Sequence, residues 1–319
     1  MGLKSVFNAL KQEGYIIKPL DMYLLSLNDK DSDRAINVNA PSQASNCSRA
    51  NYYARLQYPS DGAIDPRSRR IFDNGTGVHE RLQAYMLKSG ILISDEVPCI
   101  NDELQIQGHT DGFLNIGKIT EKTHLIPIPN KKLKRKVTIK NYSEIAILEI
   151  KSINNNGFMQ LKDAKEEHKK QAMIYLYCSE ERRLYLKKTY KTLEAFLSSE
   201  PERRKYHESK YQHVKDGSKY TREEKIQNQV EIGINADNIL YNTDKPITKV
   251  IFLYEDKNTQ ELKEYCVQRN DEILEQVTNK YRALNKAIET KQIPEREGTS
   301  KSCSTCRFCN YKITCWIVW

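Results

Sequence analysis

Two acidic residues and a lysine, Asp111, Glu149 and Lys151, are the residues of this 319-residue sequence whose types and spacing are best suited to catalysis. Glu149 and Lys151 are two positions apart in ILEIKS, so on a strand their side chains project from one face of a sheet. Asp111 belongs to an earlier segment, HTDGFL. If the two segments are neighbouring strands, the carboxylates converge and repel each other unless a cation separates them. The spacing therefore predicts a divalent metal site.

Carboxylate oxygens, completed by water and by substrate phosphate oxygens, are the ligands that Mg²⁺ and Mn²⁺ prefer. Such an ion lowers the pKa of a bound water and neutralises the charge that builds on a phosphodiester during attack. Lys151 would then hold the attacking water or the scissile phosphate. His79, in GVHERLQ, could add a nitrogen ligand, which favours Mn²⁺. Taken alone, a Glu-x-Lys pair on a strand is more often a surface ion pair, and a lone helical histidine is more often a packed residue.

The cysteines indicate a second centre. Four of the eight are scattered along the chain and four fall within its last 17 residues. The scattered residues are Cys47, Cys99, Cys178 and Cys266, and the clustered residues are Cys303, Cys306, Cys309 and Cys315. A chain of this length in a reducing compartment does not need a disulfide framework, so the cluster favours a metal or iron–sulfur site. A structural zinc is the alternative, although zinc ribbons usually set two C-x₂-C knuckles about 15 to 20 residues apart.

Periodic segments supply the scaffold that must position these residues. A helix is predicted over 77–90, where His79 and Gln83 share a neighbouring face and Gly90 is a stop signal. Strand patterns are predicted over 92–98, 104–107, 109–116 and 145–151. A basic stretch, 118–140, separates the last two strands.

A second helix is predicted over 159–178. Five residues at steps of three and four form one stripe that should face the sheet, namely Leu161, Ala164, His168, Gln171 and Tyr175. The remaining predicted elements are helices over 47–57 and 271–290 and strands over 248–255 and 261–268.

The order of these segments, with GVHE followed by GHTDGFL, LEIKS and QAMIY, resembles the PD-(D/E)XK nuclease superfamily and, within it, the RecB-like exonucleases. The resemblance covers about residues 45–180 and 246–319. It implies an α/β fold with a restriction-endonuclease-like core, in which a central mixed sheet is flanked by helices. It also implies an activity, the metal-dependent hydrolysis of DNA phosphodiester bonds.

The resemblance gives roles to single residues. With Mg²⁺ or Mn²⁺ as the metal, the metal-binding positions match His79, Asp111, Glu149 and Ile150. Lys151 matches the catalytic lysine, and Gln171 with Tyr175 matches a QxxxY motif that supports the site and contacts the nucleic acid. The implied catalytic set is therefore Asp111, Glu149, Lys151, Gln171 and Tyr175.

The cysteines extend the resemblance to iron–sulfur nucleases, namely the CRISPR-associated RecB-like exonucleases and the AddB-type nucleases. In these proteins one early and three late cysteines hold a four-iron four-sulfur (4Fe–4S) cluster that staples the ends of the domain together. The matching residues are Cys47, Cys306, Cys309 and Cys315. Cys303 is an alternative fourth ligand. We favour Cys47, because a link between distant residues removes the most freedom from the unfolded chain, about 4 to 5 kcal/mol in the loop model for disulfides.

The chain divides into an N-terminal extension, 1–45, and a RecB-like nuclease domain, 46–319, with a charged insertion at about 187–230. We expect the insertion to be a helical or mobile arm that is not part of the core. The net charge of +9 favours a polyanionic partner. The densest basic run, KKLKRK, is a candidate surface for holding DNA, and a solvated hairpin flank is its alternative. Its cations are Lys131, Lys132, Lys134, Arg135 and Lys136.

Together these features predict a metal-dependent DNA exonuclease that acts on single-stranded or frayed ends. One alternative is a DNA-binding adaptor subunit of a recombination, replication or CRISPR-adaptation complex, with little activity of its own. Another is a zinc-stapled RNA-processing factor. A GxxxxGK[ST] phosphate loop is absent from the sequence, so the chain is not an ATP-driven motor by itself. With no apolar run near about 20 residues and no secretory signal, we expect a cytoplasmic protein without a membrane partner.

Overall fold

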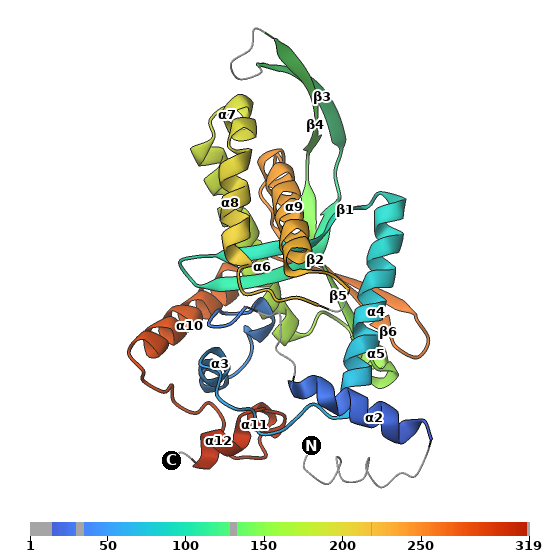
Figure 1. Cartoon of the computed structure of the whole chain (residues 1–319), viewed down its shortest axis with the longest axis vertical. Coiled ribbons are helices and arrows are strands. Elements are labelled where there is room, and N and C mark those ends of the chain that lie inside the picture. Colours follow the sequence, from blue (N-terminus) through green and yellow to red (C-terminus); the bar gives the residue numbers. More distant parts are fainter. Residues whose placement is uncertain (1–14, 30–34, 128–132, 218, 318–319) are drawn as a thin grey trace.

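The computed structural model describes residues 15–29, 35–127, 133–217 and 219–317. At its centre is a five-stranded mixed sheet with the strand order β1-β2-β5-β6-β7 (Figure 1). The strands are β1 (Leu92–Asn101), β2 (Ile106–Asn115), β5 (Ile145–Ile153), β6 (Lys249–Asp256) and β7 (Leu262–Gln268). β5 and β6 run parallel, and the other neighbours run antiparallel. The α/β class and the mixed sheet predicted from the sequence are confirmed.

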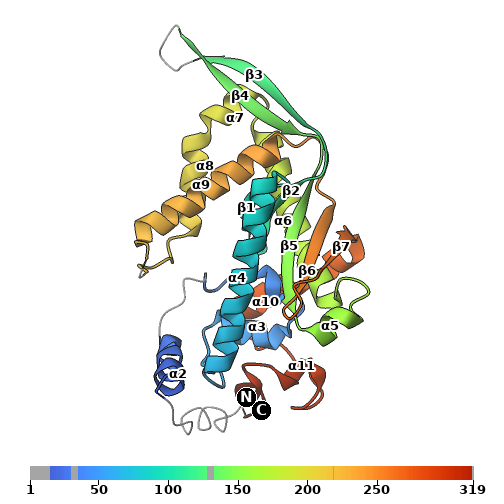
Figure 2. The ribbon, with the colours of Figure 1, turned by 90° about the vertical axis from the view of Figure 1, so that its right-hand side faces the viewer.

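Helices cover both faces of this sheet (Figure 2). They are α4 (Pro66–Ser89) on one face and, on the other, α6 (Glu166–Thr189), α9 (Arg222–Tyr241) and α10 (Asp271–Glu289). Side chains alternate along β5, so Leu148 and Ile150 pack under α4 in a small apolar cluster. Ile145 and Ile147 point the other way and join the main core with α6, α9 and α10. Glu149 therefore lies on the α6 face of the sheet.

The helix that carries His79 is longer than predicted. α4 begins at Pro66, where the Asp65 side chain accepts the Ser68 main-chain N–H at 3.0 Å. It ends at Gly90, whose φ of 78° is the left-handed conformation that stops a helix, as predicted. The prediction over 77–90 missed the first turns, because Gly75 and Gly77 lie at the junction and glycines disfavour helix.

The helix predicted over 159–178 is wrong at its start. α5 (Asn155–Gln160) ends before Leu161, and α6 begins only at Glu166. In the connection, the Asp163 side chain accepts the Ala164 main-chain N–H at 2.7 Å, a local bond that competes with helix formation. Leu161 and Ala164 are nevertheless buried in the main core. The predicted stripe therefore faces the sheet, although only its last three residues belong to α6.

The basic stretch at 118–140 forms a second, two-stranded sheet that projects from the body of the molecule (Figures 1 and 2). Its antiparallel strands are β3 (Ile119–Pro127) and β4 (Lys134–Tyr142). Lys134, Arg135 and Lys136 are exposed on β4. Lys131 and Lys132, which complete the predicted DNA-holding set, lie outside the described residues.

The described part of the charged insertion at 187–230 is mostly helical, and some of it belongs to the core. After α6 it contains α7 (Leu193–Ser198), α8 (Glu200–Lys210) and the start of α9. Phe196 is fully buried in the main core and stacks on Tyr241 with ring centroids 3.9 Å apart. A separate apolar cluster between α8 and α9 contains Tyr211, Val214, Ile226, Val230 and Ile234. The prediction that this stretch is not core is therefore wrong, because its apolar residues are spread along the sequence and meet only when α8 packs on α9.

The described segments nearest the two ends of the chain meet, because the Ser48 main-chain N–H donates to Glu297 and the Arg49 side chain donates to the main-chain oxygen of Pro294 (Figure 1). The N-terminal elements are α2 (Ile17–Ser26), η1 (Leu27–Asp29), η2 (Pro41–Gln43) and α3 (Ser48–Arg55), and the C-terminal elements are α11 (Ser304–Arg307) and α12 (Lys312–Ile317). Asn39 forms a parallel bridge with Ile106 of β2, and Ala44 joins the main core. Among the described residues, no helix is both long and apolar enough to cross a membrane.

Candidate functional site

The candidate site lies where β2 and β5 separate. The two strands pair as far as Gly112 and Leu148. Beyond this pair, the Asp111 side chain takes the place of a backbone partner on β2. Its Oδ2 accepts the main-chain N–H of Ile150 at 2.5 Å. Gly112 permits the close approach of β1, since a Cβ there would lie 2.4 Å from the carbonyl oxygen of Ser94. The prediction that Asp111 and Glu149 come from neighbouring strands is confirmed.

α4 holds Asp111 from the other side. His79 Nδ1 lies 3.0 Å from Asp111 Oδ1. About one turn later, Gln83 Nε2 donates to the main-chain oxygen of Asp111 at 2.9 Å. Burial lowers the pKa of His79, but the hydrogen bond to Asp111 and the charges of Asp111 and Glu149 outweigh it, so the pKa is raised. His79 and Gln83 thus act on one residue from the shared face that the sequence predicted.

Glu149 and Lys151 are joined to α6 by a chain of hydrogen bonds. Lys151 Nζ donates to Glu149 Oε1 at 2.6 Å and to Gln171 Oε1 at 3.2 Å. Gln171 Nε2 donates to the same Glu149 oxygen at 2.9 Å and to the Tyr175 hydroxyl at 2.5 Å. Gln171 and Tyr175 are one helical turn apart, so α6 presents both to the same strand. The structure therefore brings the predicted carboxylate, lysine, glutamine and tyrosine together.

One oxygen of Glu149 lacks a partner. Glu149 is 3% exposed, and its Oε2 is buried without a hydrogen bond from any described residue. Burial, followed by the charge of Asp111, raises the pKa of Glu149, and the opposing effects of Lys151 and of the Tyr175 hydroxyl are smaller. A buried carboxylate oxygen without a donor is unfavourable, and a bound cation would relieve it. The orphaned oxygen and the donor set of two carboxylates and one imidazole fit Mg²⁺ or Mn²⁺.

The residues of this site are at present bound to one another. Both oxygens of Asp111 have protein partners, His79 on one side and the Ile150 N–H on the other. Within the described ranges, no group of three or more His, Cys, Asp and Glu side chains is arranged as a ready-made metal site.

Glu96 on β1 is a third acidic residue of the site, and the sequence did not reveal it. Its Oε1 accepts a hydrogen bond from Gln83 at 2.9 Å, and the β1–β2 register places it opposite Asp111. Its φ of 46° is a left-handed conformation that residues with a Cβ rarely adopt. Burial raises the pKa of Glu96, and the charge of Asp111 adds to this effect. In SDEVP nothing distinguishes Glu96 from Asp95, so only the pairing with β2 selects it.

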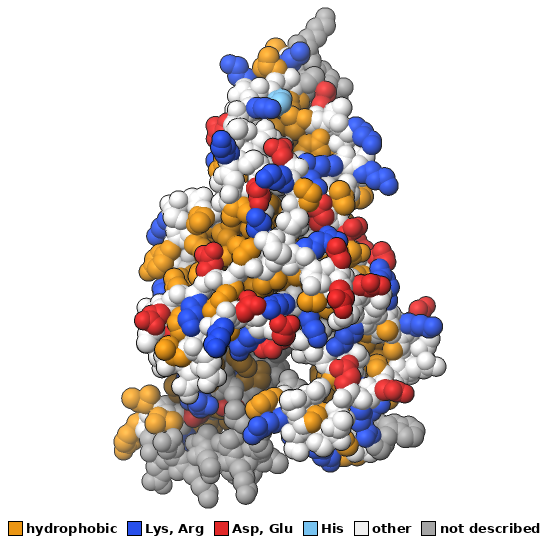
Figure 3. Space-filling view, turned by 180° about the vertical axis from the view of Figure 1, so that it is seen from behind, with side chains coloured by type: hydrophobic (Ala, Val, Ile, Leu, Met, Phe, Trp, Pro, Cys, Tyr) orange, Lys and Arg blue, Asp and Glu red, His pale blue; other side chains and the backbone are white. Residues whose placement is uncertain are grey.

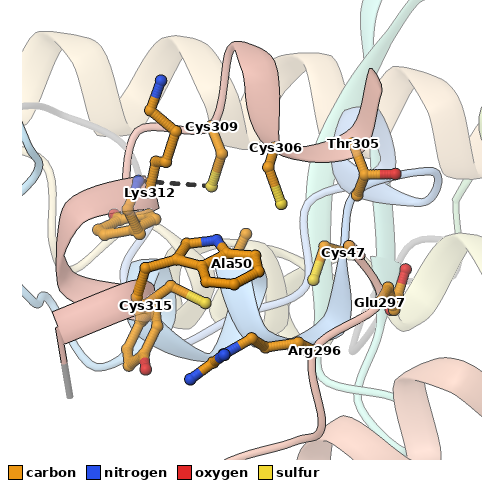
Figure 4. A pocket seen from close by; sticks show the side chains of 13 residues that line it. Cys47, Ala50, Arg296, Glu297, Thr305, Cys306, Cys309, Lys312 and Cys315 are labelled. Carbon is orange, nitrogen blue, oxygen red and sulfur yellow. Dashed lines mark hydrogen bonds between the residues drawn. The ribbon is translucent and has the colours of Figure 1, made fainter. Parts of the chain in front are cut away.

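The four predicted cluster ligands line one pocket, with about 330 Å³ of empty space that is partly open to solvent (Figure 4). Cys47 directly precedes α3, and the others come from the segment that contains α11 and α12, namely Cys306, Cys309 and Cys315. Figure 4 shows the four thiols around this space. The fold thus brings cysteines from both ends of the chain to one place.

Nitrogen donors reach two of these sulfurs. The Tyr311 main-chain N–H donates to Cys309 Sγ at 3.4 Å, and Arg49 Nη1 donates to Cys315 Sγ at 3.9 Å. Cys303 is not among the described residues that line the pocket, but its thiol is hydrogen-bonded to that of Cys306, and main-chain hydrogen bonds, that from Ser300 first, lower its pKa to about 7. Four thiols from Cys47 and the three late cysteines match the ligand count of a 4Fe–4S cluster and of a tetrahedral zinc.

The predicted DNA-holding residues that the structure describes are not part of either site. Lys134, Arg135 and Lys136 lie at the start of β4, near the outer end of the projecting hairpin (Figure 1). Glu149 and Lys151 lie in the second half of β5, which begins at the base of that hairpin. β4 and β5 follow each other along the chain. The basic residues lie at the start of β4, and the acidic site lies near the end of β5.

No family model and no curated protein matches this chain. Among solved structures, one described as "Crystal structure of SSO0001" is 14% identical in sequence, with a TM-score of 0.38. The alignment covers 95% of this chain and 96% of the other chain. A likeness at this level carries no argument about fold or function.

Proposed function

We propose that this protein is a divalent-metal-dependent deoxyribonuclease of the PD-(D/E)XK superfamily, similar to the RecB-like exonucleases. The observation that carries the proposal is the buried, unpartnered Oε2 of Glu149, on a carboxylate whose other oxygen is fixed by Lys151 and Gln171. Most buried polar atoms in proteins have a hydrogen-bond partner, so the bare oxygen of Glu149 calls for an explanation, and a bound cation would supply one. The neighbouring Asp111 supplies the second carboxylate that a metal-dependent phosphodiesterase requires.

The chain's own residues have separable tasks in this reaction. Asp111, Glu149 and His79 would hold the metal, and the Ile150 N–H fixes the orientation of Asp111. A bound Mg²⁺ or Mn²⁺ would supply charge neutralisation at the phosphate and a water of lowered pKa. The Lys151 ammonium has three N–H donors, of which Glu149 and Gln171 take two. The third can donate to a phosphate oxygen or to the attacking water.

The site is recessed, which supports a single strand as the substrate. The exposed fractions of the side chains are 4% for Glu149, 13% for Asp111, 22% for Lys151 and 30% for His79. A phosphate on a flexible single strand reaches partly enclosed groups more readily than one held in a stiff duplex. A frayed or single strand can bend into the site, so we propose exonucleolytic action on such ends.

For the cysteine pocket we propose a 4Fe–4S cluster on Cys47, Cys306, Cys309 and Cys315. The support is their placement around one pocket and the N–H donors at the sulfurs, which stabilise thiolate charge. When bound, the cluster would link α3 to the segment that contains α11 and α12. Zinc is the alternative, and the two are separated by colour, because only iron–sulfur protein is brown.

The nuclease proposal is tested on end-labelled linear and on circular single-stranded DNA, with Mn²⁺ or Mg²⁺ and with chelator. We expect metal-dependent release of short products from the linear DNA only, and no release by Lys151→Ala. Lys162→Ala, which removes an exposed lysine outside the site, is the matched control. Wild-type protein that binds the DNA but leaves it intact would instead support the adaptor alternative.

The cluster proposal is tested by anaerobic purification of Cys47→Ser and Cys303→Ser. We expect Cys47→Ser to lose iron and visible absorbance, because it removes a sulfur from the pocket, and Cys303→Ser to keep both. The opposite pattern would make Cys303 the fourth ligand, and stoichiometric zinc in colourless wild-type protein would exclude the cluster.

A further inference from the structure

The β3–β4 hairpin extends away from the rest of the protein. It forms its own sheet and does not pair with the central one. Each strand has nine residues, so the ribbon is about 30 Å long at about 3.3 Å per residue. Figures 1 and 2 show it projecting beyond the helices in two views. A ribbon of this length outside the body presents a large surface to a partner.

The hairpin is strongly basic. Between Ile116 and Ser143 the sequence has eight Lys and Arg and a single acidic residue, Glu121. All the described cations of this stretch are exposed, namely Lys118, Lys122, Lys134, Arg135, Lys136 and Lys140. The space-filling view shows Lys and Arg side chains distributed over the projecting end of the molecule (Figure 3). The one acidic side chain is 4.0 Å from Lys140, so it offsets little of this charge.

One face of the hairpin is open beyond its base, where Tyr142 is buried. Residues that pair directly share a face, and the register pairs Glu121 with Lys140, Thr123 with Thr138 and Leu125 with Lys136. All six of these residues are exposed. The opposite face carries the buried Ile126 and Ile139. We call the first surface the open face, and its described cations are Lys134, Lys136 and Lys140.

We propose that the open face holds the double-stranded part of an end-bearing DNA, while the frayed strand enters the acidic site. The choice of DNA rests on the proposed nuclease function. A two-stranded ribbon fits the DNA major groove, whereas the major groove of double-stranded RNA is too deep and narrow. The cations and the hydroxyl pair of Thr123 and Thr138 are groups that contact phosphates.

The composition of the hairpin argues against a single-strand platform. Proteins that hold single strands stack the bases on exposed aromatic rings. In the described part of the hairpin, the aromatic rings are Tyr142, which is buried, and His124, which is half-buried. A surface of cations and hydroxyls without rings contacts the backbone of a duplex, where phosphates are densest.

The chain also fixes how far from the acidic site the duplex is held. From Asp111 the chain runs through β2 and then β3 to Pro127, a distance of at most about 50 Å at about 3.3 Å per residue. At about 3.4 Å per base pair, a duplex of at most about 15 base pairs from the acidic site reaches the end of the hairpin. Shorter duplexes would touch only its base.

The experiment measures DNA binding by fluorescence anisotropy with chelator present, so that cleavage plays no part. The substrates are a single DNA strand, a series of DNA duplexes from about 8 to about 24 base pairs, each with the same single-stranded end, and a double-stranded RNA of the longest length. The hairpin variant combines Lys134→Gln, Lys136→Gln and Lys140→Gln. The matched control combines Lys88→Gln, Lys286→Gln and Lys291→Gln, which remove three exposed charges elsewhere.

We expect wild-type affinity to rise with duplex length until about 15 base pairs and then to level off. The hairpin variant should bind the long duplexes on the order of 100-fold more weakly, with a logarithmic salt slope about three units shallower, because three phosphate contacts are lost. Its affinity for the single strand should stay within a few-fold of wild type. The control should behave as wild type.

Three outcomes would overturn the proposal, namely an unchanged salt slope on duplexes, an equal loss on the single strand, and a preference for double-stranded RNA. A parallel assay follows Mn²⁺-dependent cleavage of a short single strand that cannot reach the hairpin. If wild-type protein shows the length dependence but no cleavage, the nuclease proposal fails and the hairpin proposal stands. If it cleaves normally but shows no length dependence, the reverse holds.

Discussion

Two buried carboxylates in this protein have opposite surroundings. Asp237 on α9 is 1% exposed, and the guanidinium of Arg182 donates to both its oxygens, at 2.8 and 2.7 Å. His207 Nε2 lies 3.1 Å from Oδ2, and Arg203 Nη1 lies 3.6 Å from the same oxygen. Glu149 is similarly buried, but its partners all meet one oxygen and its Oε2 has none among the described residues.

The pKa values of the two groups follow these surroundings. For Asp237 burial acts to raise the pKa, but the hydrogen bonds from His207 and Arg182 and their charges prevail and lower it to about 2. For Glu149 burial prevails, with the charge of Asp111 beside it, and the pKa is raised. The difference teaches that a carboxylate kept for stability is saturated with cations. One that is left short of positive charge has room for a metal ion.

Replacing each carboxylate by its amide tests this comparison, and the largest effect on stability is expected at Asp237. We expect Asp237→Asn to lower the free energy of unfolding by about 3 to 5 kcal/mol, because Arg182 and Arg203 then remain buried without a negative charge. Urea unfolding measures the change. The cleavage rate per folded molecule should stay at the wild-type value, and a stability loss below about 1 kcal/mol would contradict the role given to Asp237.

The same substitution at the acidic site should have the opposite profile. We expect Glu149→Gln to reduce cleavage about 1,000-fold, because it removes a negative ligand from the metal site. The free energy of unfolding should change by less than about 1 kcal/mol, since the amide oxygen still accepts from Lys151 and Gln171 and a buried charge is gone. Single-turnover cleavage and urea unfolding are the measurements. Retained activity would disprove the site.

Added Mn²⁺ should stabilise only those proteins that keep the Glu149 carboxylate. At a Mn²⁺ concentration about 100 times its dissociation constant, the free energy of unfolding should rise by about 2.7 kcal/mol, because only the folded protein presents the site. Thermal unfolding with Mn²⁺ and with chelator measures this shift. Asp237→Asn should keep the shift and Glu149→Gln should lose it. An equal shift in both variants would place the metal elsewhere.

The smallest expected effect is a pH dependence that belongs to Asp237. Its pKa in the folded protein, about 2, lies below the ordinary value of 3.8, so the charged form stabilises the fold above about pH 4. This contribution, about 2 kcal/mol, should be lost as the pH falls from about 4 to 2. It is measured as the difference in unfolding free energy between wild type and Asp237→Asn at each pH. A difference that stays constant over this range would contradict the prediction.

Much of the fold could be predicted, because its signals are local. Alternation within 145–151 and 248–255 identified the two parallel strands of the sheet within two residues of their observed ends. The start of α6 could not be predicted, since a helical stripe through Leu161 and Ala164 continues across a break that the Asp163 side chain makes. The pairing of β3 with β4 was also missed, because charges obscure the apolar pattern there.

The candidate site could be predicted to a similar extent. The order of the motifs selected His79, Asp111, Glu149 and Lys151, and the structure places them together. The order of the motifs did not select Glu96, which becomes part of the site only through the register of β1 with β2. The assignment of metal and catalytic roles to these residues stays a prediction that the experiments above decide.

By itself the sequence determined which segments form strands and helices, and it placed cysteines at both ends of the chain, because periodicity and spacing are properties of neighbouring residues. Only the tertiary structure decided which buried carboxylate receives cations and which does not. The partners of Asp237 come from α6 and α8, 30 or more residues away in sequence. Electrostatic energies depend on distance in space and on burial, and neither is written in the spacing of residues along the chain.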